Sequence, residues 1–511
     1  MCGIVAVYGE VDARECEAML TCLRHRGPDD WGTVQAGPSW LGHRRLSIVD
    51  VDGGHQPLST ADGTLHMVGN GEIYNHAEIR AGLAASCRSD SDNEVALHLV
   101  DERGPGALST LRGMYAMAIA GEDGRFVAAR DPVGIKPLYW ARQDGAVRFA
   151  SELGAFPVRW RPSVDVFPPG HYWTPHSGLV EFASLERVEP VPAVSGLPRV
   201  PPPSSPPALL AAVRQVIVTA VERRMMGDVP VGVFLSGGLD SSLVAAVAAR
   251  HAAREGARVP TFAVGTAGSP DLAAARLVAE HLGTDHHERV FTADEAVAVL
   301  PEVIGAMESY EPSLVRSAVP NYLLAELASR HVKVVLTGEG ADELFAGYEY
   351  LRAMTDAGDL HAELVRTVAG LHNLNLQRCD RVTMAHSLEA RVPFLDLDVI
   401  ALGLSLPAAW KLPASEPRRR MEKHVLREAF SDWLPAEIVW REKLQFGDGS
   451  GATVALGDRM SATVGEADLL GGQATLVPPP RTREELAYRR LFEARFEGVV
   501  ADRVLGRFAT A

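Results

Sequence analysis

The segment from Asp228 to Ser242, DVPVGVFLSGGLDSS, constrains this chain more than any other stretch. Its apolar run at 231–235 contains β-branched residues and predicts a short buried strand. The Ser-Gly-Gly sequence at 236–238 breaks that strand, and an alanine-rich helix begins at Leu239. A strand, a glycine turn and a helix N-terminus together leave unpaired backbone N–H groups where the helix dipole favours negative charge. The segment therefore predicts an anion-binding site.

The residues of this loop indicate which anion it binds. Ser236, Ser241 and Ser242 add hydroxyl donors to the backbone N–H groups. No lysine follows the glycines, which excludes a Walker A loop, and the G-x-S-x-G spacing of a nucleophile elbow is absent. The residues SGGLDSS resemble the pyrophosphate loop of the ATP pyrophosphatase family. This resemblance implies cleavage of ATP to AMP and pyrophosphate.

Composition limits the remaining possibilities. With 511 residues, 47% of them hydrophobic, the chain is long enough for two or three domains. A formal charge of −15 argues against nucleic acid as the main partner. The sequence contains neither a run of 18 apolar residues nor a signal-peptide pattern, so we expect no membrane span. Five cysteines without C-x-x-C spacing favour a reduced, cytoplasmic protein over a disulfide framework or a zinc site.

The N-terminus offers a candidate nucleophile. Removal of Met1 would leave Cys2 with both a thiol and a free amine, whose reference pKa values are about 8.5 and about 7.7–8.0. The amine could then act as the base for the thiol. The alternative is that Cys2 is simply part of a buried strand, CGIVAVYG. Three later segments favour the nucleophile: LRHRGPD at 23–29, HRRLSIVD at 43–50 and NGEIYN at 70–75.

These segments, with MCGI, resemble the glutaminase domain of the class II amidotransferases. The resemblance implies an αββα N-terminal-nucleophile fold in which Cys2 attacks the side-chain amide of glutamine. Asn70 and the Gly71 N–H would hold the oxyanion, a contribution of about 3–4 kcal/mol per donor in other enzymes. Arg45 would bind the α-carboxylate in bidentate fashion, with Arg44 as a rival.

The resemblance also implies a set of residues around the bound glutamine. Glu72 and Asp92 would bind its α-ammonium; the alternative for Asp92, which lies in an acidic run, is a solvated face. The glutamine-binding residues implied are Arg45, Leu46, Ser47, Ile48, Val49, Asn70, Gly71, Glu72 and Asp92. A further motif at 130–139, RDPVGIKPLY, matches the family, and we interpret it as structural because its prolines and glycine set turns.

A proline-rich stretch at 188–207 predicts the boundary between domains. It contains PPP and SSPP and can form a semi-rigid connector but no helix or central strand. We therefore expect a glutaminase domain at 1–187, a linker at 188–207 and an α/β synthetase domain at 208–511. A helix is expected at 208–224, leading into the nucleotide loop.

Two further strands are expected after that loop, at 260–265 and 332–336. In a doubly wound sheet, ligands bind at the C-terminal ends of the strands, which places Leu235 and Val264 beside adenine. The alternative is that both are ordinary core residues. The third strand runs into TGEGADELFAGY at 337–348, whose acids suit magnesium, amine recognition or proton acceptance.

The family resemblance assigns roles within this half. Glu339 is implied in forming the acyl-adenylate and in the amine step, while Asp240 and Asp342 are candidates for magnesium or substrate contact. Arg316 and Lys443 match family positions near the leaving pyrophosphate. The segments at 387–396 and 421–424 are interpreted as scaffold around the acceptor pocket. The expected ATP-binding residues are Leu235, Ser236, Gly237, Gly238, Asp240, Ser241, Ser242, Val264, Arg316, Thr337, Gly338 and Lys443.

The two halves make chemical sense together, because adenylation gives a carboxylate a good leaving group and a nearby glutaminase supplies ammonia shielded from water. From residue 1 to about 450 the chain resembles the glutamine-hydrolysing asparagine synthetases. That resemblance implies ATP, Mg²⁺, aspartate and glutamine as cofactor and substrates, a β-aspartyl-AMP intermediate, an ammonia tunnel and, in many members, a homodimer. The departures are Thr337 in place of the usual serine, a poor match at 414–420 and a fading resemblance after about 465.

Two alternatives remain open. One is an amidotransferase for another carboxylate, such as a natural-product precursor. The other is a non-catalytic regulator that only binds nucleotide or glutamine, against which the presence of Cys2, Asp240 and Glu339 argues.

Overall fold

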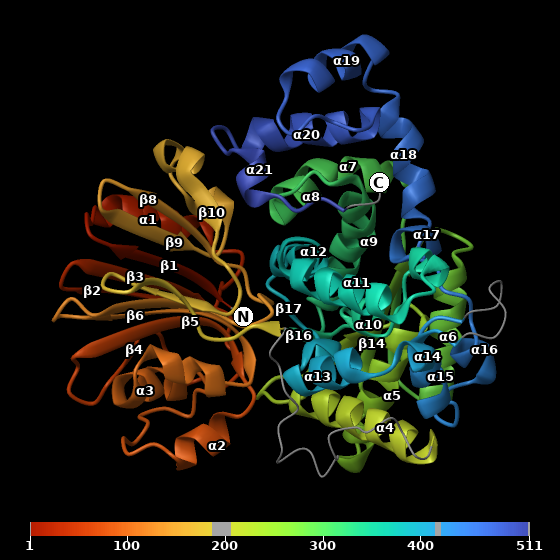
Figure 1. The fold of residues 1–511 in the computed structure, drawn as a ribbon, viewed down its shortest axis with the longest axis horizontal. Helices are drawn as coiled ribbons and strands as arrows, with labels where there is room; N and C mark the ends of the chain where they lie inside the picture. Colours follow the sequence, from red (N-terminus) through yellow and green to blue (C-terminus); the bar gives the residue numbers. More distant parts are fainter. Residues whose placement is uncertain (1, 186–205, 414–420, 509–511) are drawn as a thin grey trace.

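The structure, a computed structural model, describes residues 2–185, 206–413 and 421–508. It consists of an all-antiparallel N-terminal half beside a parallel α/β C-terminal half (Figure 1). The predicted linker lies outside the described residues except for 206 and 207, which begin helix α4. The poorly matching stretch at 414–420 also lies outside them.

The N-terminal half is built on two six-stranded antiparallel sheets. The first has the order β10-β8-β9-β1-β3-β2 and the second the order β12-β11-β7-β6-β5-β4. The strands are β1 (Gly3–Tyr8), β2 (Asp30–Ala36), β3 (Ser39–Arg45), β4 (Leu58–Ser59), β5 (Leu65–Ile73), β6 (Gly113–Gly121), β7 (Phe126–Arg130), β8 (Tyr139–Gln143), β9 (Ala146–Ala150), β10 (Val164–Val166), β11 (His171–Thr174) and β12 (Gly178–Glu181).

Aromatic side chains fill the space between these two sheets. Phe126 and Trp173 of the second sheet pack against Phe149 of the first, with ring centroids 5.6 Å and 5.7 Å from it. Helix α1 (Ala13–Cys22) packs on the outer face of the first sheet, and α2 (His76–Ala81) and α3 (Glu94–Arg103) lie outside the second. The αββα layering expected from the sequence is confirmed.

The C-terminal half is built on one five-stranded parallel sheet of order β15-β14-β13-β16-β17. Its strands are β13 (Val231–Phe234), β14 (Pro260–Gly265), β15 (Asp285–Val290), β16 (Val334–Leu336) and β17 (Glu389–Arg391). Helices cover both faces of the sheet (Figure 1).

The helices of this half fall into two groups in the sequence. Those before β16 are α4 (Pro206–Arg223), α5 (Leu239–Arg254), α6 (Pro270–Leu282), α7 (Ala293–Ala298), α8 (Leu300–Met307) and α9 (Pro312–Ala328). Those after it are α10 (Ala341–Leu344), α11 (Ala357–Gly370), α12 (Asn375–Met384), α13 (Leu397–Ser405), α14 (Ala408–Lys411), α15 (His424–Ala429), α16 (Ala436–Val439), α17 (Phe446–Gly449), α18 (Ala452–Ser461), α19 (Glu466–Thr475), α20 (Arg483–Arg495) and α21 (Ala501–Val504).

The strand order creates a switch point between β13 and β16. The chain leaves β13 for β14 on one side and later returns to β16 on the other side, so the connections after these strands diverge. Ligands bind in the crevice that such a divergence opens at the C-terminal ends of the strands. Here the two loops touch: a Cβ added to Gly338 would lie 2.8 Å from the Cβ of Asp240. The site predicted from the loop sequence therefore has its expected place in the sheet.

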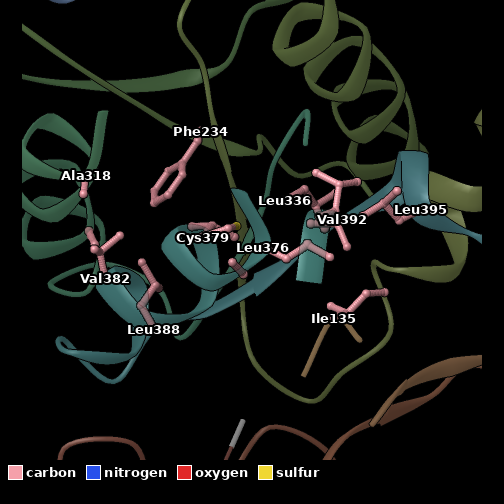
Figure 2. Packing of buried hydrophobic residues seen from close by; sticks show 14 of the residues in the cluster. Ile135, Phe234, Ala318, Leu336, Leu376, Cys379, Val382, Leu388, Val392 and Leu395 are labelled. Carbon is pink, nitrogen blue, oxygen red and sulfur yellow. The ribbon is translucent and has the colours of Figure 1, made fainter. Parts of the chain in front are cut away.

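The two halves share one hydrophobic core. Ile135 of the N-terminal half belongs to the same buried cluster as Leu336, Leu376 and Val392 of the C-terminal half (Figure 2). The RDPVGIKPLY motif, interpreted as structural, therefore also forms an interface. In the part of the chain that the structure describes, no helix has the length and apolar character needed to span a membrane.

Candidate active sites

Cys2 lies buried at the head of β1, 7% exposed. Its backbone N–H donates to Oδ1 of Asn70 at 2.9 Å. Burial raises the pKa of the Cys2 thiol, against the opposing effects of the Leu46 backbone N–H and the Arg45 charge. A thiol held protonated in this way needs a nearby base before it can attack a carbonyl.

Asn70 and Gly71, the two predicted oxyanion donors, lie next to each other on β5. Asn70 is fully buried, and its Nδ2 has no hydrogen-bond partner among the described residues. Position 71 tolerates only glycine, because its φ is +150° and a Cβ there would lie 1.9 Å from the carbonyl oxygen of Met114. A buried donor without an acceptor is costly, so the orphaned amide fits an acceptor supplied by a ligand.

Two buried acids lie in the same half. Glu72 is 4% exposed and Asp92 is 2% exposed. Burial raises the pKa of Glu72 well above its usual range, with further contributions from the charges of Glu389 and Asp92. Burial likewise raises the pKa of Asp92, whose carboxylate accepts a 2.6 Å hydrogen bond from the Ile73 N–H. The solvated-face interpretation of Asp92 is therefore wrong, and both acids are placed where an ammonium would offset their charge.

The two candidate arginines point in different directions. Arg45 is buried and donates to the carbonyls of Val51 at 3.0 Å and Asp50 at 2.6 Å, which ties it to the following loop. Arg44 instead lies 5.6 Å over the Trp31 ring and donates to the backbone of helix α1. Because the Arg45 charge acts on the Cys2 thiol, Arg45 is the better placed of the two.

The 46–49 loop, also predicted to contact glutamine, reaches the C-terminal half. The Ser47 N–H donates to Asp29 at 2.8 Å, and Asp29 in turn accepts from Lys333 at 2.6 Å. The carbonyl of Ile48 accepts from the Asp228 N–H at 2.9 Å. The loop that borders the glutaminase site is thus anchored next to the nucleotide segment.

Sequence reasoning missed a buried charge network that joins the halves. Arg26 is fully buried and donates to the Cys2 carbonyl at 3.0 Å, to Glu152 at 2.9 Å and to Asp380 of α12 at 2.9 Å. On the other side of the interface, Arg391 contacts both Glu389 and Glu72. Arg26 was visible in the RHRGPD motif, but nothing in the sequence indicates a partner 354 residues away.

A cavity of about 800 Å³ opens at the switch point. Of the predicted nucleotide residues, those that line it are Leu235, Ser236, Gly238, Asp240, Ser241, Val264, Arg316, Thr337, Gly338 and Lys443. Gly237 and Ser242 do not line it. Gly237 has φ +70° and lets helix α6 approach, because a Cβ there would lie 2.5 Å from Ala274. Ser242 is fully buried and its Oγ has no hydrogen-bond partner among the described residues, so its role as a phosphate donor stays a prediction.

The two predicted magnesium ligands are bridged by a lysine. Nζ of Lys423 lies 2.5 Å from Asp240 and 2.6 Å from Asp342, and Lys443 also pairs with Asp342. Burial acts to raise the pKa of Asp342, but the charges of Lys423 and Lys443 outweigh it and hold that pKa well below its usual range. The MEKH segment was interpreted as scaffold, so the central position of Lys423 was missed.

The carboxylates still fit a hard cation. Oδ1 of Asp240 has no hydrogen-bond partner among the described residues. Mg²⁺ is bound in proteins by one or two carboxylates together with substrate phosphates, and both would be available here. Asp240 and Asp342 are therefore the residues that would hold it.

Glu339 and Arg316 each form an arginine–carboxylate ion pair that the sequence did not reveal. Glu339 is paired with Arg378 of α12. Arg316 on α9 is held by Glu484 of α20 through its Nε at 3.0 Å, and Arg507 and Phe508, also from the region after 465, line the cavity. The ion pair orients Arg316 while it lines the cavity.

Comparisons with known proteins agree with this geometry. A model described as glutamine amidotransferase domain matches residues 1–192, and one described as asparagine synthase matches 212–357 and 352–501. The asparagine synthetase [glutamine-hydrolyzing] 3 of Arabidopsis thaliana is 40% identical over 521 residues, covering 97% of this chain and 88% of the relative. The probable asparagine synthetase [glutamine-hydrolyzing] of Dictyostelium discoideum is 36% identical over 536 residues, covering 98% and 94%. The chain belongs to the family of glutamine-hydrolysing asparagine synthetases.

Proposed function

We propose that this enzyme synthesises L-asparagine from L-aspartate, ATP and L-glutamine, and releases AMP, pyrophosphate and glutamate. The observation that carries the proposal is the combination of a buried Cys2 beside an orphaned Asn70 amide with a nucleotide-sized cavity at the sheet's switch point. We assign residues 1–187 to the glutaminase domain and 208–511 to the synthetase domain, joined by the linker at 188–207.

In the glutaminase domain, Met1 is removed and the new amine of Cys2 takes the thiol proton. The thiolate attacks the glutamine amide, and the Asn70 Nδ2 and Gly71 N–H stabilise the oxyanion. Arg45 binds the α-carboxylate, while Glu72 and Asp92 bind the α-ammonium. The raised pKa values of both acids support this assignment, because an ammonium would favour their ionised forms.

In the synthetase domain, the loop at 236–242 binds the phosphates of ATP, and Leu235 and Val264 flank the adenine. Asp240 and Asp342 would hold Mg²⁺, which supplies charge neutralisation on the phosphates when bound. The aspartate β-carboxylate attacks the α-phosphate, while Lys423, Lys443 and Arg316 stabilise the departing charge. Ammonia then displaces AMP from the β-aspartyl adenylate beside Glu339.

The proposal includes a cellular location and an oligomeric state. All five cysteines are free thiols, which supports a reducing, cytoplasmic location. A homodimer is also proposed on the family resemblance, and light scattering at several protein concentrations tests it.

Mass spectrometry with amide-¹⁵N-labelled glutamine, aspartate and ATP tests the reaction. We expect labelled asparagine in equal amounts with AMP. Cys2→Ala should abolish glutamine-dependent synthesis yet retain synthesis with ammonium, because the two sites use different residues. Formation of ADP and phosphate in place of AMP would overturn the adenylation chemistry.

A further inference from the structure

The cavity extends well beyond the nucleotide loop. Its far wall is formed by α10, α11, the first turns of α12 and the 3₁₀ segment Glu349–Ala353. None of these elements belongs to the nucleotide loop. This part of the cavity lies beyond Glu339, where an acceptor must sit if its carboxylate is to reach the α-phosphate.

One buried carboxylate on this wall has no cationic partner among the described residues. Glu343 of α10 is 2% exposed and lines the cavity. It accepts hydrogen bonds from the Tyr348 hydroxyl and, at 3.2 Å, from Nδ2 of Asn375, but no described residue forms an ion pair with it. A buried acid of this kind lacks a positive charge that a ligand could supply.

One cation on the same wall is incompletely used. Arg378 lies on α12, one turn after Asn375, and is 6% exposed. Among the described residues, Glu339 is the only acceptor of a hydrogen bond from its side chain, and its Nε is buried without a partner. A guanidinium has five donors in a planar fork suited to a carboxylate. Arg378 therefore has donors to spare next to Glu339.

The other charged groups of the cavity either have matched partners or, like Glu349, Glu442 and Asp448, are exposed. Lys423 and Lys443 are held by the acids at the nucleotide end, and Arg441 is paired with Asp271 at 2.8 Å. At the outer mouth, Arg366 binds both oxygens of Glu363 at 2.7 Å. Among the buried groups of the described cavity wall, Glu343 therefore offers a negative charge without a cationic partner and Arg378 offers unused donors.

We propose that Glu343 and Arg378 form a clamp for the α-ammonium and α-carboxylate of the amino-acid acceptor. This inference rests on the proposed function, because it assigns the acceptor's binding groups in the same site. Tyr348 and Asn375 orient Glu343, and Glu339 orients Arg378. The acceptor's side-chain carboxylate then points back to the nucleotide loop, which Gly338 and Asp240 bring into contact with the strand end that carries Glu339.

The test uses two acceptor analogues that each lack one half of the zwitterion. Succinate lacks the α-ammonium, and β-alanine lacks the α-carboxylate. Pyrophosphate release is measured with ATP, Mg²⁺ and ammonium, which bypasses the glutaminase site. For an analogue that does not react, its inhibition constant in competition with aspartate measures the enzyme's preference for aspartate over that analogue.

The wild-type enzyme should prefer aspartate over each analogue by at least about 30-fold, because removing one partner of a buried charge pair has an effect of that order. Glu343→Gln should collapse the preference over succinate towards unity and retain the preference over β-alanine. Arg378→Gln should instead abolish the preference over β-alanine and retain the preference over succinate. Tyr348→Phe, which removes only the hydroxyl that orients Glu343, should partly reduce the preference over succinate.

Glu363→Gln is the matched control, since Glu363 is also a cavity-lining carboxylate with a tyrosine donor. It should leave both preferences unchanged. Retained glutaminase activity shows that each variant is folded. The clamp is overturned if both Glu343→Gln and Tyr348→Phe still discriminate against succinate as the wild type does. It is also overturned if Glu363→Gln loses that discrimination instead. A wild-type enzyme that releases no pyrophosphate with aspartate would instead refute the proposed function.

Discussion

Replacement of Lys423 by methionine gives the sharpest test of the charge cluster at the nucleotide site. The Lys423 side chain is 2% exposed, and its Nζ lies 2.5 Å from Asp240 and 2.6 Å from Asp342. At an effective dielectric constant of about 20, each contact corresponds to about 6–7 kcal/mol of Coulomb energy before desolvation is subtracted. Breaking such a buried pair has a net cost of about 3–5 kcal/mol. We therefore expect Lys423→Met to destabilise the C-terminal half by that amount at pH 7.

The pH dependence of this loss has a definite sign. The lysines hold the pKa of Asp342 below its usual range, so their stabilising effect is present above the unfolded pKa and disappears as pH falls through the folded value. In Lys423→Met the carboxylates are easier to protonate. The difference from wild type should therefore shrink as pH falls from 7 towards 4. Mg²⁺ should stabilise the variant more than the wild type if Asp240 and Asp342 hold the cation.

Urea unfolding, followed by fluorescence at pH 7 and pH 4.5 with and without Mg²⁺, measures these effects. The control is Lys333→Met, which removes a bridge of similar length, 2.6 Å, to Asp29. Those side chains are 38% and 29% exposed, and such surface pairs contribute less than about 1 kcal/mol. Equal losses in the two variants at pH 7 would refute the reasoning.

Three further outcomes are expected. Arg26→Met should lower the free energy of unfolding by about 3 kcal/mol or more and abolish glutaminase activity, because it leaves buried carboxylates without a cation and removes the donor to the Cys2 carbonyl. A denaturant profile like that of the wild type would contradict this. Gly237→Ala should raise the KM for ATP several-fold, since φ +70° and contact with α6 exclude a Cβ, and an unchanged KM would count against a rigid loop. The Glu152 charge raises the pKa of His25, so its stabilising effect is present below the unfolded pKa of about 6.5 and lost as pH rises through the folded value. His25→Gln should therefore lower the melting temperature at pH 6 but not at pH 9, and equal shifts at both would exclude the ion pair.

The sequence predicted local structure well where one segment contains all the determinants. The strand at 260–265 is found with those bounds as β14, and the helix expected at 208–224 is α4 (Pro206–Arg223). Glycines and prolines mark such turns directly, and hydrophobic periodicity identifies the buried faces.

The sequence failed where partners come from distant segments. Nothing in MEKH indicates that Lys423 reaches Asp240, 183 residues earlier. The loop motif also contains Ser242, yet Ser242 lies buried on the first turn of α5 and does not line the cavity. Side-chain direction at a strand–helix turn depends on the packing of neighbouring elements, which a motif does not contain.

The buried arginines between the halves restrict how such an enzyme can change. Arg26 comes from the N-terminal half, but one of its acidic partners, Asp380, comes from the C-terminal half, and for Arg391 and Glu72 the arrangement is reversed. A chimaera that joins this glutaminase to a synthetase half without counterparts of Asp380 and Arg391 would bury charges without their partners. The two halves must therefore be inherited, or engineered, as a matched pair.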